Sequence, residues 1–136
     1  MSGVVGSVFG RRRAIVEQGV YVGQYTLVGS AALRARALIG SRVSLLSGPS
    51  LHDWDADHGW LPFDGRKIRR IEIGAGSWIG EGAVVMADVG AGAMVAAGSV
   101  VSTAVAPAVM VGGNPARFVR RLAQGSEPPA VSAGAP

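Results

Sequence analysis

The stretch "IVEQGV YVGQYT LVGSAA LRARAL IGSRVS LLSGPS", residues 15–50, divides into units of six residues. Each unit begins with a large apolar residue, and the leading residues are Ile15, Tyr21, Leu27, Leu33, Ile39, Leu45 and, in the next unit, Leu51. The same beat returns further along the chain at Ile73, Ile79 and Val85, and then, shifted by two residues, at Val89, Val95 and Val101. We take this repeat as the feature that decides the fold.

A period of six matches neither the 3.6 residues of an α-helix nor the simple alternation of a hairpin strand. It is typical of a solenoid whose coils have three short faces of about six residues each. We expect the aliphatic residue that leads each unit to point inward and to stack on the leading residues of neighbouring coils. Glycine and alanine suit the tight corners between faces. The sequence therefore predicts an all-β solenoid of triangular coils over residues 15–112.

Composition agrees with a thin, regular architecture. Of the 136 residues, 49% are hydrophobic but only 6% aromatic, and 21 are glycine, so the core consists of small and β-branched side chains. The length suits one domain. No apolar run approaches the roughly 20 residues of a membrane span. Residues 1–14 form a flank whose positive charges follow the apolar stretch, the reverse of a secretory signal, so we expect a cytoplasmic protein.

The net charge of +4 is spread along the chain without interleaved aromatic residues, which argues against nucleic acid as a partner. A basic surface with no dedicated partner and a small polyanionic ligand both fit this charge. The chain has no cysteine, which excludes disulfides and thiolate chemistry.

One segment breaks the repeat. Leu51 and Ile73 are 22 residues apart, which is not a multiple of six, so an excursion leaves the solenoid at about residues 53–70. This segment, "DWDADHGWLPFDGRKIRR", is rich in charged and aromatic residues. Functional residues concentrate on such loops when a rigid scaffold holds them. His52 stands where the excursion departs, and His58 stands out on it.

The aspartates of this segment do not predict a metal site. Asp53, Asp55 and Asp57 are spaced like the first ligands of a calcium loop, but that loop needs glycine at its sixth position, where His58 stands. We therefore expect no metal ion here.

The segment "SWIGEGAVVMADVGAGAMVAAGSVVSTAVAPAVMVGGNPARFVRRL", residues 77–122, resembles the hexapeptide-repeat acyltransferases. It is most similar to the branch that contains the maltose, galactoside, xenobiotic and colanic-acid O-acetyltransferases. The matching pieces are Trp78–Gly80, Ala96–Val101 and Gly113–Arg117. The resemblance implies a left-handed parallel β-helix and acetyl-CoA as co-substrate. It also implies a homotrimer with active sites between subunits, and a sugar or other small molecule whose hydroxyl accepts the acetyl group.

The excursion carries its own part of the resemblance. In "HDWDADH", a His-Asp pair is followed by a second histidine six residues after the first, as in the colanic-acid type. This similarity implies that His52 is the general base that takes the proton from the acceptor hydroxyl. Asp53 is a candidate to orient the imidazole, and His58 and Trp78 are candidates to contact substrate. Trp54, Trp60 and Phe63 fit either an apolar rim for the acceptor or an anchor to a neighbouring subunit.

The resemblance also implies where acetyl-CoA binds. The backbone at Ala97, Gly98 and Ser99 would lie along the pantetheine arm, because these small residues leave room for an extended ligand; corner packing alone is the alternative. Arg117, Arg120 and Arg121 fit phosphate contacts or a solvated surface. Two departures stand out: the corner "MADVG" is shorter than the family pattern, and Ala104 replaces a basic residue expected near the phosphates.

The C-terminal signature predicts a short helix over residues 113–123. Asn114 is a good N-cap and Pro115 suits the first helical position. The helix would place Phe118, Val119 and Leu122 over the open end of the solenoid. We expect the tail that follows, residues 124–136, to be mobile because it is poor in aromatic and large aliphatic residues.

Three other interpretations share the predicted fold. A γ-class carbonic anhydrase needs three zinc-binding histidines per site, and two per chain would serve only if both lie at a subunit boundary. Serine acetyltransferases end in a similar Gly-x-Pro-Ala-Arg but carry an additional helical N-terminal domain. A catalytically inactive scaffold would require His52 to be inert.

Overall fold

The structure is a computed structural model that describes residues 4–5 and 14–123. The mobile tail predicted over residues 124–136 lies outside the described residues, as does most of the N-terminal flank. Among the described residues, the helical structure amounts to one 3-10 turn, η1 (Gly65–Lys67), and no helix could cross a membrane.

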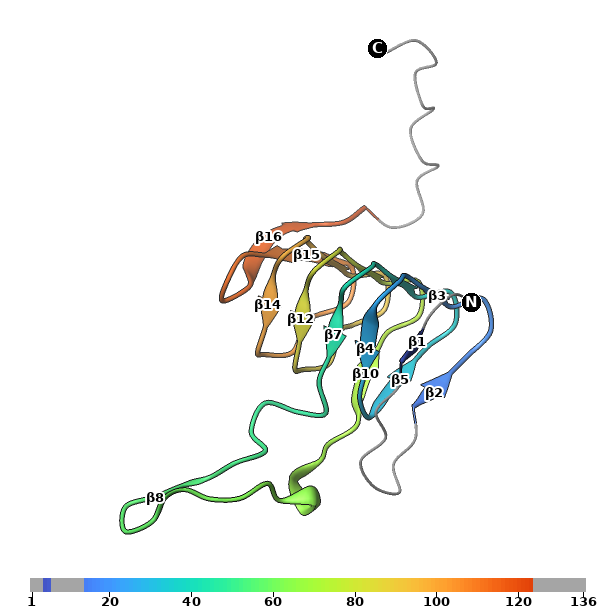
Figure 1. Ribbon diagram of the computed structural model, residues 1–136. Helices are drawn as coiled ribbons and strands as arrows, with labels where there is room; N and C mark the ends of the chain where they lie inside the picture. The colour runs from blue at the N-terminus through green and yellow to red at the C-terminus, as the bar shows by residue number, and fades with distance from the viewer. Residues whose placement is uncertain (1–3, 6–13, 124–136) are drawn as a thin grey trace.

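Three sheets make up the body of the molecule (Figure 1), and their strands run parallel except for the last strand of the third sheet. Sheet A contains β1 (Val4–Val5), β4 (Thr26–Val28), β7 (Ser44–Leu45), β12 (Val84–Val85) and β14 (Val100–Val101). Sheet B contains β2 (Ile15–Val16), β5 (Ala31–Leu33) and β10 (Ile71–Ile73), continued by single bridges at Val89 and Val105. Sheet C contains β3 (Tyr21–Val22), β6 (Leu38–Ile39), β11 (Trp78–Ile79), β13 (Met94–Val95), β15 (Val109–Gly112) and β16 (Arg117–Arg121).

The chain visits the sheets in the fixed order B, C, A, and we call one such pass a coil. Successive coils stack in register: Ile79 pairs with Val95, and Val95 with Val111, a separation of 16 residues in each case. Residues that share a register position form inward ladders, such as Leu45, Val85 and Val101, which are at most 1% exposed. The core is therefore a set of stacked valine, isoleucine and leucine ladders, as the six-residue repeat predicts.

The prediction of which residues point inward is wrong in the first coil, β2 to β4. There the predicted inward residues Tyr21 and Leu27 are 59% and 40% exposed, whereas the neighbouring Val22 and Val28 are buried. Neighbouring residues of a strand point to opposite faces, so one of each pair must face solvent. Val28 pairs with Leu45, and this register puts the valines inside. The sequence has two adjacent apolar residues at each of these positions, and the repeat alone does not distinguish them.

The two-residue shift at "MADVG" is confirmed. Val85 and Val89 are both buried, and Val89 bridges to Ile73 in sheet B. Val85 and Val89 are four residues apart, whereas the leading residues of the regular repeat are six apart, because the chain here turns directly from sheet A into sheet B. The same short corner recurs between Val101 and Val105, which bridges to Val89.

The predicted C-terminal helix is wrong. Residues Arg117–Arg121 form β16, which runs antiparallel to β15 and closes a hairpin whose turn includes a cis bond between Asn114 and Pro115. The reason lies in the sheet edge: β15 is the last parallel strand of sheet C, so its backbone groups on that side need partners. A returning strand supplies them, whereas a short isolated helix would gain little stability of its own.

Glycine permits the close stacking of coils at the corners. A Cβ atom built on Gly74 would lie 2.3 Å from the backbone nitrogen of Ala91, and one built on Gly90 would lie 2.4 Å from that of Pro107. Any side chain at these positions would overlap the backbone of the next coil. The glycines that follow the leading aliphatic residues therefore set the distance between coils.

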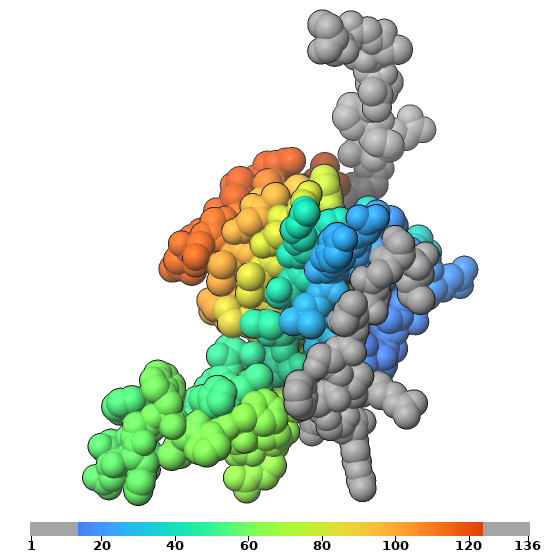
Figure 2. Space-filling view, in the orientation of Figure 1, coloured from blue at the N-terminus to red at the C-terminus, as the bar shows by residue number. Residues whose placement is uncertain are grey.

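The excursion leaves sheet A after β7 and returns at β10. It projects from the body as a separate arm, clearly visible in Figures 1 and 2. Its outer part is a hairpin of β8 (Trp54–Asp55) and β9 (Gly59–Trp60), in which Trp54 pairs with Trp60. The two indole rings meet edge to face, with centroids 5.4 Å apart. We refer to residues 46–70 as the arm.

Candidate active site

His52 lies on the arm, between the body and the hairpin. The arm's two legs are joined on either side of it: the N–H of Asp64 donates to the Leu51 carbonyl at 3.2 Å, and the N–H of Leu61 donates to the Asp53 carbonyl at 2.8 Å. His52 is the residue between these two bonds. Its backbone is therefore held in place even though its side chain faces solvent.

The imidazole of His52 is oriented by a backbone group. Its Nδ1 lies 2.9 Å from the carbonyl oxygen of Leu61, and its ring packs edge to face on Phe63 with centroids 6.3 Å apart. A carbonyl oxygen only accepts hydrogen bonds, so Nδ1 must carry the proton. In the neutral ring this leaves a lone pair on Nε2. The arrangement is the one that a general base requires.

Asp53 does not orient His52. Its carboxylate contacts the ammonium group of Lys67 on the returning leg, and the Leu61 carbonyl takes the orienting position instead. The sequence placed Asp53 next to His52, but adjacent residues on an extended chain point in opposite directions. Leu61 was missed because a backbone carbonyl leaves no residue-type signal.

His58 lies at the tip of the hairpin. Its Nδ1 is 3.1 Å from Oδ1 of Asp55, an atom that also accepts the backbone N–H groups of Asp57 and His58. These bonds, the one from Asp57 first and the side-chain bond from His58 next, lower the pKa of Asp55. The two predicted histidines thus belong to one arm but have separate hydrogen-bond partners.

The arm contains a cavity of about 360 Å³. Leu61 and Phe63, which hold the imidazole, line it together with Asp53, Pro62, Asp64 and Arg66. Arg66 donates to both carboxylate oxygens of Asp64 at 2.9 and 3.0 Å, which lowers the pKa of Asp64 and raises that of Arg66. The cavity offers charged and aromatic groups to a polar ligand, and two of its lining residues, Leu61 and Phe63, contact His52.

Trp78 lies in a different part of the molecule. It is 50% exposed on the outer face of sheet C, where it stands in register with Leu38 and Met94. The arm connects sheets A and B, so a single chain does not bring Trp78 to His52.

The three predicted cofactor residues at the corner after β13 differ in exposure. Ala97 and Gly98 are exposed, and a Cβ on Gly98 would meet nothing within 4 Å. Ser99 is fully buried, and its hydroxyl accepts the N–H of Gly113 at 3.1 Å. The Ser99 side chain therefore supports the corner from inside, whereas Ala97 and Gly98 form an open wall.

The C-terminal arginines separate onto two surfaces because β16 is a strand. Arg120 stands in register with Met110 on the outer face of sheet C, the face that also carries Trp78 and Met94. Arg117 and Arg121 line a cavity at the end of the coil stack. Among the predicted phosphate contacts, Arg120 alone shares a face with Trp78.

Within residues 4–5 and 14–123, no group of three or more histidine, aspartate or glutamate side chains gathers as metal ligands would.

Solved structures of acyltransferases share this architecture. Serine acetyltransferase from Neisseria gonorrhoeae aligns at 26% identity with a TM-score of 0.59, over 79% of this chain and 39% of that enzyme. AntD, an N-acyltransferase from Bacillus cereus solved with dTDP and 3-hydroxybutyryl-CoA, aligns at 17% identity with a TM-score of 0.66, over 89% of this chain and 66% of that enzyme. A maltose O-acetyltransferase from Clostridium difficile 630 aligns at 21% identity with a TM-score of 0.54, over 90% of this chain and 71% of that enzyme.

The chain thus spans less than half the length of the serine acetyltransferase it matches. No protein-family model matches the sequence, and curated proteins give no significant match. The structural neighbours have acyl transfer in common, although their acceptors differ.

Proposed function

We propose that this protein is an acetyl-CoA-dependent O-acetyltransferase of the hexapeptide-repeat type, built as a left-handed parallel β-helix. The observation that carries the proposal is the hydrogen bond from Nδ1 of His52 to the Leu61 carbonyl, which leaves the lone pair of Nε2 available as a base. Leu61, which accepts this bond, also lines a polar cavity of the arm. The shared architecture with acyltransferases supports the same chemistry.

In the proposed reaction, Nε2 of His52 accepts the proton of the acceptor's hydroxyl group. At the same time the hydroxyl oxygen attacks the thioester carbonyl carbon of acetyl-CoA. The carbon–sulfur bond then breaks, and the imidazolium returns the proton to the leaving thiolate. The products are an acetyl ester and free CoA. The co-substrate supplies the activated acetyl group. The Leu61 carbonyl keeps the imidazole in one tautomer and one orientation throughout.

We propose that the pantetheine chain of acetyl-CoA binds along the wall formed by Ala97 and Gly98. The open space at Gly98 fits this role, because an extended chain can approach the backbone there without meeting a side chain. Arg120 and Trp78 lie on the adjoining outer face of sheet C, so Arg120 is the arginine we assign to the phosphates. Trp78 would flank the acetyl group or the acceptor.

The proposal requires more than one copy of the chain. His52 lies on an arm between sheets A and B, whereas Ala97, Gly98 and Trp78 lie at or beside sheet C. A cyclic homotrimer would place the arm of one subunit beside sheet C of the next. Each site would then combine His52 of one chain with the cofactor wall of another. We place the enzyme in the cytoplasm.

The acceptor we propose is a small molecule with a reactive hydroxyl. The arm cavity, with Asp64, Arg66 and Phe63 on its walls, suits a polyhydroxylated compound such as a sugar. His58 at the hairpin tip would contact it from outside.

The first test is calorimetric titration of the full chain with acetyl-CoA, followed by an acetylation screen that includes maltose and serine. We expect saturable binding at one site per chain, weakened by Arg120→Gln and unchanged by His52→Gln. His52→Gln should lower kcat by about 10²–10⁴-fold. His58→Gln is the matched control, a second histidine of the same arm, with a smaller effect.

Two outcomes would contradict the proposal. Absence of binding at millimolar acetyl-CoA would remove the co-substrate assignment and favour a scaffold. Full activity in His52→Gln would remove the base.

A further inference from the structure

The coil stack ends in a step at its C-terminal end. Among the described residues, sheet A stops at β14 and sheet B at the bridge of Val105, while sheet C continues through β15 and β16. The last inward residues of sheets A and B therefore have a coil on one side only. β16 rises beside them as a wall, which leaves a cavity of about 380 Å³ across the end of the stack.

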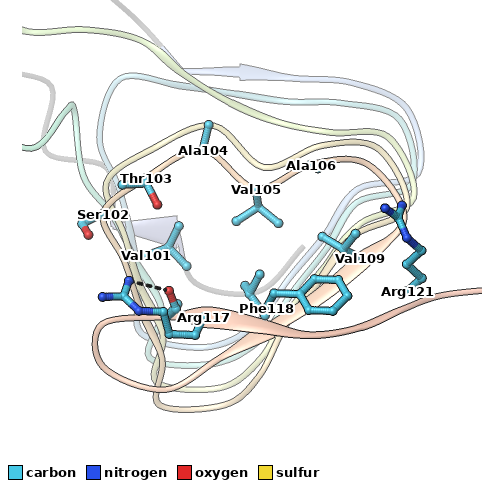
Figure 3. Close-up of a pocket in the computed structure, with 12 residues that line it drawn as sticks. Val101, Ser102, Thr103, Ala104, Val105, Ala106, Val109, Arg117, Phe118 and Arg121 are labelled. Carbon is cyan, nitrogen blue, oxygen red and sulfur yellow. Dashed lines mark hydrogen bonds between the residues drawn. The ribbon is translucent and has the colours of Figure 1, made fainter.

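The floor and the wall of this end cavity are apolar. Val101, Val105 and Val109 point toward its centre, and Phe118 of β16 stands over them (Figure 3). Phe118 is 62% exposed, an unusual position for an aromatic ring that borders a core. A ligand with an aliphatic chain would bury this ring and pack against the inward residues at the end of the stack.

The two ends of the cavity are positively charged. Arg117 and Arg121 lie on opposite sides of Phe118 (Figure 3). Within the described part of the chain, neither guanidinium has a carboxylate in ion-pair distance; the closest recorded bond of Arg117 is to the Ala116 carbonyl at 3.5 Å. The sequence shows why: residues 89–123 contain three arginines and no aspartate or glutamate.

Anionic ligands fit this combination. Arginine binds carboxylate in a bidentate fashion, and the bond is stronger beside an apolar wall than in open water. The hydroxyl-bearing residues Ser102 and Thr103 also line the cavity. Its volume lies in the range of small-molecule sites.

We propose that the end cavity is a binding site for an aliphatic carboxylate of medium chain length, with its chain over Val101, Val105 and Phe118 and its carboxylate on Arg121. The site is separate from the proposed acetyltransferase site. Neither proposal depends on the other.

The probe is sodium octanoate, titrated into the full-length protein by calorimetry and by methyl NMR. We expect saturable binding with one site per chain and shifts in the methyl signals of Val101, Val105 and Val109. Octan-1-ol has the same chain without the charge, and it should bind at least about tenfold more weakly. Saturating acetyl-CoA should leave octanoate binding unchanged.

The variants separate a built site from a general attraction. Arg121→Gln should weaken octanoate binding about tenfold, and Arg121→Lys should restore part of it. Arg36→Gln removes one positive charge from a distant corner and should have no effect. Thermal unfolding of each variant checks that the fold is intact.

Five results would overturn the proposal. Four concern binding: absence of saturable binding at about 10 mM octanoate, equal binding of octanol, equal binding by Arg121→Gln, and displacement by acetyl-CoA. The fifth is end-to-end self-association of the protein that octanoate does not change in sedimentation, which would assign the surface to a second copy of the chain.

Discussion

The coil stack and the arm are held together by different means. In the stack, inward residues such as Ile39, Ile79 and Val95 are fully buried and every coil hydrogen-bonds to its neighbours. In the arm, both tryptophans are more than 60% exposed. An ion pair between Asp53 and Lys67 joins its two legs, and Asp64 and Arg66 form a local pair on the returning leg. The packed aliphatic core therefore lies in the coils, whereas both histidines lie on the exposed arm.

Breaking a buried ladder should have the largest effect. We expect Ile39→Ala to cost about 2–5 kcal/mol in the free energy of unfolding, because Ile39 is fully buried between Val22 and Ile79. Its neighbour Leu38 points outward on the same strand and is 47% exposed, so Leu38→Ala is the matched control with a smaller cost.

The measurement is urea unfolding at two protein concentrations, which separates subunit contacts from the fold. Equal costs for Ile39→Ala and Leu38→Ala at both concentrations would contradict the inward and outward assignment.

The glycine corners should come next. Gly74→Ala would place a methyl group 2.3 Å from the Ala91 nitrogen and push two coils apart, at a cost of about 1–3 kcal/mol. In the arm, Gly65→Ala meets only Phe63 at an ordinary 3.6 Å and should change stability by less than about 0.5 kcal/mol. Thermal unfolding compares the two. A larger loss of stability in Gly65→Ala than in Gly74→Ala would contradict the claim that the coils are packed more tightly than the arm.

A smaller effect should be confined to the arm. Trp60→Ala removes the edge-to-face pair with Trp54, worth about 0.5–1.5 kcal/mol. We expect hydrogen exchange of the Leu61 amide, which bonds to Asp53, to accelerate about 2- to 10-fold. The Gly40 amide, which bonds to Ile79 in the stack, should not change. Equal acceleration of both amides would mean that arm and stack open together.

The smallest expected effect is a pH dependence at the surface of the stack. Arg34 joins three coils: it donates to Glu17 at 2.7 Å and to both oxygens of Glu72 at 2.7 and 2.8 Å. The bond from Arg34 lowers the pKa of Glu17 below its usual 4.5. A carboxyl whose pKa is lowered by folding contributes stability above its unfolded pKa and loses it as the pH falls through the folded pKa.

The thermal midpoint of the wild type should therefore exceed that of Arg34→Gln at pH 6, and the gap should narrow below about pH 4. Arg36→Gln controls for the loss of a charge. A gap that stays constant down to pH 3 would show that Arg34 acts through packing instead.

Sequence reasoning predicted the stack well at Leu33, Ile39, Ile79 and Val95, leading residues of the repeat that are all fully buried. It misread the first coil, where Tyr21 and Val22 are both apolar, and it misread residues 117–121 as a helix. The helix prediction rested on capping residues, which are local signals. The strand forms because residues 117–121 pair with the open edge of β15, which the sequence does not show.

The candidate site divides in the same way. His52 and its place on an excursion were readable because histidine is rare in this chain and the repeat is broken there. The Leu61 carbonyl that sets its tautomer was not, because any residue carries a carbonyl.

By itself, the sequence determined the six-residue period and with it the buried ladders. Each face of a coil must bury one aliphatic residue, and this requirement appears in the sequence as a regular spacing of aliphatic residues. The tertiary structure alone decided the register of the first coil, the strand at the C-terminus and the division of the arginines between sheet C and the end cavity. These depend on which backbone groups lie within hydrogen-bonding reach after the chain has coiled, and that is a property of neighbours distant in sequence.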